Sequence, residues 1–143
     1  MYHQREAESV TCSRVSGYKR GKCLKNYLIK SQQPEEFWTD ERCFIKELCN
    51  TDELSGGSLA IARVEAGVTT QLHSLIGLTE TYIVIEGRGL MEVNAKQFNI
   101  EVGDQVVIPP GLSQRVTALG LSELRFYCLC VPRFRPESYI SLE

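Results

Sequence analysis

The sequence has 143 residues, of which 43% are hydrophobic and 24% are charged, and its formal net charge at pH 7 is −2. This length suits one domain with one core, and the composition excludes a disordered or membrane-embedded chain. We also expect a cytoplasmic protein, because the chain shows neither an apolar stretch of transmembrane length nor the apolar centre of a secretory signal.

Six cysteines occur without a CxxC pair and without the spacing of a secreted disulfide scaffold, so we expect reduced thiols. Cys128 and Cys130 are two residues apart in an apolar run, and a strand would direct both sulfurs to one face. A metal-ligand or redox role is the alternative. Burial in the core is the favoured interpretation, because free cysteine is commonly buried.

The first part of the chain differs in charge from the rest. Residues 1–26 contain six Lys or Arg against two Glu and show neither helical nor strand periodicity. We expect a basic, irregular N-terminal arm, followed by a single domain over residues 27–143. Such an arm can bind nucleic acid by neutralising phosphates, but solvated arms are far commoner, and we expect no nucleic-acid partner.

The pattern becomes regular after the arm. An apolar run at 27–29 predicts a strand, and Pro34 with the two acids that follow it predicts one helical turn over 34–38. Beyond these, short segments rich in Val, Ile, Leu and Tyr are separated by turns that contain Gly or Pro, which predicts an all-β sandwich or barrel. The predicted strands cover 43–48, 58–65, 70–76, 81–86, 89–93, 97–101, 105–108, 113–118 and 123–131.

Two motifs lie within this β region. The first has the form G-x5-H-x-H-x3,4-E-x6-G, and Leu75 stands at its second histidine. Its other positions are occupied by Gly67, His73, Glu80 and Gly87.

The second motif has the form G-x5-P-x-G-x2-H-x3-N, and Gln114 and Ala118 stand at its histidine and asparagine. Its other positions are Gly103, Pro109 and Gly111. With these motifs the sequence resembles the cupin superfamily, and the ending 130–134 resembles a subgroup of small bacterial cupins, which suggests a bacterial source. The resemblance implies a cupin-type double-stranded β-helix, or jelly-roll barrel, with an irregular N-terminal extension.

In the family that the sequence resembles, the motif histidines and the glutamate hold one divalent metal ion inside the barrel. The donors that remain here are His73, Glu80 and Gln114, which could hold Zn, Fe, Mn or Ni with waters completing the shell. Leu75 offers an alkyl group that coordinates nothing, and the Gln114 amide is a weak donor. We therefore expect any metal ion to bind with reduced affinity.

An inward carboxylate at Glu80 needs a partner, because an unpaired buried charge is costly. The candidates are a metal ion, His73 as imidazolium, Arg63 and Arg115. Strand parity places Tyr82 on the same face as Glu80. In the expected site the catalytic residues are therefore Glu80 and His73. The substrate-binding wall is formed by Tyr82, Leu75, Arg63 and Gln114.

Two functions are compatible with this site. One is a small-molecule cupin that acts as a metal-assisted enzyme of the dioxygenase or isomerase type, with Glu80 or His73 moving a proton. The other is a metal-free ligand-binding or sensor cupin without catalysis. If no metal ion binds, a metal-free acid/base enzyme that uses His73 and Glu80 is the alternative to that binding protein. We also expect a homodimer, because an open sandwich leaves edge strands that need cover and the segment at 27–30 could pair with a neighbour.

Overall fold

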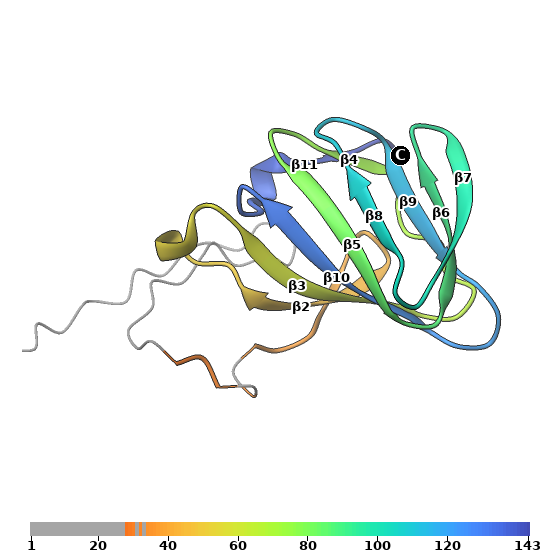
Figure 1. Cartoon of the computed structure of the whole chain (residues 1–143), viewed down its shortest axis with the longest axis horizontal. Helices are drawn as coiled ribbons and strands as arrows, with labels where there is room; N and C mark the ends of the chain where they lie inside the picture. Colours follow the sequence, from red (N-terminus) through yellow and green to blue (C-terminus); the bar gives the residue numbers. More distant parts are fainter. Residues whose placement is uncertain (1–27, 31, 33) are drawn as a thin grey trace, which may run out of the picture.

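The computed structural model describes residues 28–30, 32 and 34–143, so the expected arm over 1–26 lies outside the described residues. These residues form two antiparallel sheets and no α-helix. The two sheets face each other as a jelly-roll barrel, and the C-terminus lies beside the smaller one (Figure 1). The all-β jelly-roll prediction is confirmed.

The larger sheet has six strands, and β10 lies at its centre between β3 and β5 (Figure 1). In spatial order they are β1 (Phe37–Thr39), β2 (Cys43–Cys49), β3 (Ser58–Val64), β10 (Leu124–Val131), β5 (Thr79–Glu86) and β8 (Gln105–Ile108). The smaller sheet has five: β11 (Tyr139–Ser141), β4 (His73–Leu75), β9 (Gln114–Ala118), β6 (Arg88–Val93) and β7 (Lys96–Glu101). Two short 3-10 turns, η1 (Asp52–Leu54) and η2 (Pro136–Ser138), complete the elements.

All nine strands predicted between 43 and 131 are present, with ends that shift by a few residues. The N-terminal predictions are wrong where they can be examined: Leu28 and Ile29 are exposed and lie outside any strand, and Tyr27 lies outside the described residues. The expected helical turn at 34–38 is replaced by β1. The Trp38 ring meets the Phe44 ring edge-on, 5.0 Å away, so pairing with β2 outweighs the local helix signal.

The inner face of the larger sheet changes from apolar to polar along its strands. Phe126 of β10 lies between Ala62 of β3 and Val84 of β5. Further along the same strand Cys130 lies beside Glu80, and both are buried. The apolar core therefore fills one end of the barrel, and polar side chains enter at the other.

The smaller sheet repeats this change in polarity. Strand β9 directs Ala118, Val116 and Gln114 inward, and all three are buried. Val116 pairs with Met91 in the core, whereas Gln114 pairs with His73 of β4. The polar ends of the two sheets face each other and define the candidate site.

A motif glycine controls one of the turns that set this register. Gly87, between β5 and β6, has φ +76°, a left-handed conformation that glycine adopts without strain. A Cβ atom there would stand 2.3 Å from the carbonyl oxygen of Glu123. The position is therefore structural.

Two further expectations concern the surroundings of the chain. The four cysteines that fall within the described residues, namely Cys43, Cys49, Cys128 and Cys130, are free thiols. In the part of the chain that the structure describes, no helix is long and apolar enough to span a membrane.

Candidate functional site

The three residues at the centre of the predicted site are buried at the polar end of the barrel. Their exposed fractions are 2% for His73, 7% for Glu80 and 1% for Gln114. Strand pairing brings His73 and Gln114 together on the smaller sheet, and Glu80 comes from β5 on the larger one. Burying three polar side chains inside a small barrel is costly unless they have partners.

A hydrogen bond between the sheets fixes part of this arrangement. The Tyr82 hydroxyl donates to Gln114 Oε1 at 2.8 Å, and the Tyr82 ring stacks on Phe126 with the ring centroids 4.2 Å apart. Gln114 Nε2 and Glu80 Oε2 are buried and have no hydrogen-bond partner among the described residues. The Gln114 side chain is nevertheless close enough to Glu80 to lower the pKa of its carboxyl, as is the Cys128 thiol.

His73 is oriented by Gln71, which lies two residues before it, and by the C-terminal strand. Its Nδ1 lies 2.8 Å from the carbonyl oxygen of Gln71, which can only accept, so Nδ1 carries the proton and Nε2 keeps its lone pair in the neutral ring. The Tyr139 ring of β11 stacks on the imidazole with the centroids 4.8 Å apart, and its hydroxyl donates to Gln71 Oε1 at 2.7 Å. Burial lowers the pKa of His73, so the neutral form is favoured near pH 7.

Glu80 shows the opposite effect of burial. Removal from water raises the pKa of its carboxyl to about 7, although the neighbouring His73 partly opposes this rise. The carboxyl is therefore divided between its acid and its base form near neutral pH. Such a group can both donate and accept a proton under these conditions.

A second carboxylate near the site, that of Glu41, was not predicted from the sequence. Glu41 lies in the turn between β1 and β2, and its backbone carbonyl accepts from the Gln71 amide at 2.9 Å. Burial is the main cause of the raised pKa values of Glu80 and Tyr139, and the charge of Glu41 adds to both. A polar turn carries no sequence signal that distinguishes a carboxylate near a barrel interior from one in open solvent.

Two predicted wall residues take different places. Leu75 is buried, as expected, in a small apolar cluster with Cys130 and Tyr139. Arg63, by contrast, alternates with the inward Ala62 and pairs instead with Glu36 and Glu123, while its guanidinium lies 4.0 Å from the Phe44 ring centroid.

The assignment of Arg63 to the substrate-binding wall is therefore wrong. Strand alternation places it on the outer face, where acidic partners and an aromatic ring hold its side chain. Arg115, the other arginine considered as a partner of Glu80, pairs with Glu92 at 3.0 Å. Of the three side chains considered as partners of Glu80, the structure brings only His73 close.

The donor set does not fit the divalent metal ion that the family commonly binds. Leu75 supplies no donor atom, and Gln114 Oε1 already accepts a hydrogen bond from Tyr82. Among the described residues, no three His, Cys, Asp or Glu side chains are placed to hold one ion together. The predicted ligand set His73, Glu80 and Gln114 thus amounts to one imidazole, one carboxyl and one engaged amide.

The fold and the buried polar residues together define a small β-barrel protein with a polar end inside the barrel. Residues 60–131 match the family described as "Cupin domain", so the chain belongs to the cupin family. The chain is also 33% identical to the uncharacterized protein MJ1618 of the archaeon Methanocaldococcus jannaschii over 107 residues, which cover 73% of this chain and 86% of that protein.

Solved structures share the fold at low sequence identity. One is Pac13 of Streptomyces, a nucleoside dehydratase whose structures include complexes with uridine. Its TM-score is 0.71 at 17% identity, and the match covers 83% of this chain and 92% of that chain. Another is a predicted oxalate decarboxylase from Thermotoga maritima, with a TM-score of 0.64, 21% identity and coverage of 73% and 98%. At these identities the likeness shows the fold alone.

Proposed function

We propose that this cupin binds a small polar organic molecule at the polar end of its barrel, and that Glu80 and His73 transfer protons on it without a metal ion. The observation that carries the proposal is the buried Glu80 carboxyl, which has an unpartnered Oε2 and lies near His73. Buried polar atoms without partners are rare in folded proteins, so a bound ligand is one candidate partner for this atom.

The two side chains are suited to complementary roles. Neutral His73 carries its proton on Nδ1, so its Nε2 lone pair can accept a proton from carbon. Glu80 in its acid form can donate a proton to a leaving oxygen. Removal of a proton next to a carbonyl and protonation of a hydroxyl on the following carbon would release water and form a double bond.

This chemistry indicates the compounds to test. Polyhydroxylated aldehydes and ketones have both an acidic C–H bond and a hydroxyl leaving group, and the structurally similar Pac13 makes nucleosides a second group to include. Proton NMR in D₂O would detect loss of water or incorporation of deuterium. We expect turnover by the parent chain before and after dialysis against a chelator, and none by the Glu80→Gln variant. Turnover that follows metal content, or that survives Glu80→Gln, would contradict the proposal.

A non-catalytic binding cupin is the second candidate. The observation in its favour is the hydrogen bond between Tyr82 and Gln114, which occupies a position where the family motif has a metal-binding histidine. Saturable binding of a compound that the protein leaves unchanged over hours would support this alternative.

We also propose that the chain forms a homodimer through the outer face of the larger sheet. An antiparallel sheet normally presents polar side chains to water, but here Leu129 of β10 is 38% and Val107 of β8 61% exposed, on either side of Thr81 of β5. At the end of this face Arg125 pairs with both Glu123 and Glu86, so the arginine charge is compensated within one chain. An apolar face of this kind is complementary to a second copy of itself in a two-fold dimer.

A further inference from the structure

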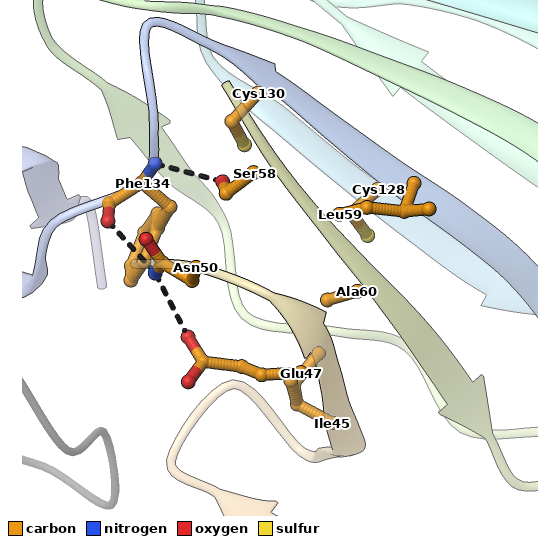
Figure 2. A pocket seen from close by; sticks show the side chains of 9 residues that line it. All are labelled: Ile45, Glu47, Asn50, Ser58, Leu59, Ala60, Cys128, Cys130 and Phe134. Atoms are coloured by element: carbon orange, nitrogen blue, oxygen red, sulfur yellow. Dashed lines mark hydrogen bonds between the residues drawn. The ribbon is translucent and has the colours of Figure 1, made fainter. Parts of the chain in front are cut away.

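A small cavity lies on the inner face of the larger sheet, next to the site. Its volume is about 40 Å³. Room for one water requires roughly 10–15 Å³ on the same scale, whereas whole-ligand pockets exceed about 300 Å³. The cavity therefore suits one small chemical group rather than a whole metabolite. It is lined by Ile45, Glu47, Asn50, Ser58, Leu59, Ala60, Cys128, Cys130 and Phe134 (Figure 2).

Glu47 is the ionisable carboxyl in this lining. Its Oε1 accepts from Asn50 Nδ2 at 3.1 Å, and the same amide group donates to the carbonyl oxygen of Phe134 at 3.0 Å (Figure 2). Burial raises the pKa of Glu47, while Asn50 and Arg133 partly oppose this rise.

The nearby Arg133 does not neutralise Glu47 by direct contact. Its guanidinium lies 2.8 Å from Asp52 Oδ1 and donates to Asn50 Oδ1 at 3.3 Å. Because Arg133 is already paired with Asp52, no described residue forms an ion pair with Glu47. A cationic group in the cavity would form one.

Strand register connects the cavity to Glu80. Glu47 of β2 pairs with Ala60 of β3, which pairs with Cys128 of β10, which pairs with Tyr82 of β5. Three strand spacings correspond to roughly 14 Å along the sheet. Since Glu80 precedes Tyr82 by two residues on the same strand, Glu80 and Glu47 lie on the same inner face of the larger sheet.

From this geometry we infer that the cavity is a subsite for a positively charged nitrogen group of the ligand, held by Glu47 with Asn50 and an apolar wall. The inference rests on the proposed function, because it treats the cavity as the far end of the molecule on which Glu80 acts. The ligand class is then an elongated polar amine or amidine rather than an organic anion.

The test uses three probes of matched shape and different charge, n-propylammonium, n-propanol and propionate, titrated into the ¹⁵N-labelled full chain. We expect propylammonium to shift the Asn50 side-chain amide and the backbone amides of Ala60 and Cys128 in a saturable way, propanol to bind more weakly, and propionate to have no effect. Glu47→Gln should weaken propylammonium binding by about tenfold or more. The exposed Glu101→Gln on β7 is the matched control and should leave it unchanged.

A measurement on the parent chain covers the case in which Glu47→Gln does not fold. Acidification protonates Glu47 but not the amine, so propylammonium binding should be lost as the pH falls. Equal binding of propionate, or propylammonium binding that ignores both acidification and Glu47→Gln, would overturn the subsite. Glu80→Gln separates the two proposals: propylammonium binding should persist in this variant even if no proton transfer is ever found. Conversely, proton transfer without amine binding would refute the subsite alone.

Discussion

Replacing Glu80 with glutamine keeps the shape of the side chain and removes its ability to ionise. In the folded chain burial raises the pKa of this carboxyl from 4.5 to about 7. Below pH 4.5 the carboxyl is protonated in both the folded and the unfolded chain and has no pH-dependent effect. As the pH rises from 4.5 through 7, the Glu80 carboxyl ionises in the unfolded chain but stays protonated in the folded chain. The folded parent therefore loses stability relative to the unfolded chain.

The size of this loss follows from the shift in pKa. Each unit corresponds to about 1.4 kcal/mol, so the free energy of unfolding of the parent should fall by about 3 kcal/mol relative to Glu80→Gln between pH 4.5 and pH 7.5. Above that range the difference should become constant. The order of stabilities should thus shift in favour of the variant as the pH rises.

Urea unfolding at half-unit pH intervals measures this difference directly. Comparison of two folded chains that differ only at Glu80 cancels the titration of groups that do not interact with it. Glu101→Gln, on the exposed side of β7, controls for the change in net charge. A difference between the parent and Glu80→Gln that stays constant with pH, or that favours the parent as the pH rises, would refute the reasoning.

Three further predictions test other parts of the structure. Tyr82→Phe leaves Gln114 Oε1 buried without its hydrogen-bond donor, so the free energy of unfolding, measured in urea at pH 7, should fall by about 1–3 kcal/mol. An unchanged free energy of unfolding would show that this hydrogen bond between the sheets does not stabilise the fold. The double variant Leu75→His, Gln114→His supplies two imidazoles and should bind Zn²⁺ or Ni²⁺ more tightly than the parent in calorimetry, whereas equal affinity would argue against an inward site. In sedimentation velocity the parent should be a dimer and Leu129→Lys a monomer, and a parent that is monomeric at all concentrations would contradict the dimer.

Much of the β scaffold could be predicted from the sequence because local signals agree with the fold. Alternating or apolar runs bounded by glycine turns gave each strand from β2 to β10. Motif spacing also indicated that Glu80 and Gln114 are buried. Strand β1 was missed because Pro34 and two acids favour a helical turn locally, and pairing of Trp38 with Phe44 on β2 outweighs that preference. The short β11 has no such pattern and depends on its partner β4.

The site was harder to predict, because it depends on which face a side chain occupies and on contacts between segments far apart in sequence. Arg63 was assigned inward without knowledge of the register that places Ala62 there. Glu41 and Glu47 belong to no motif. The backbone carbonyl of Glu41 accepts a hydrogen bond from the Gln71 amide, which places the Glu41 turn next to the site. Glu47 lines a cavity that forms only when β2, β3 and β10 lie side by side.

The central claim is that Glu80 inside the barrel exchanges a proton near neutral pH. A ¹³C NMR titration of the chain labelled in glutamate carboxyls tests it most directly, with the Glu80 signal assigned by its absence from Glu80→Gln. The account predicts a midpoint at about pH 7 for this signal. A midpoint near 4.5, the ordinary value for glutamate, would contradict it.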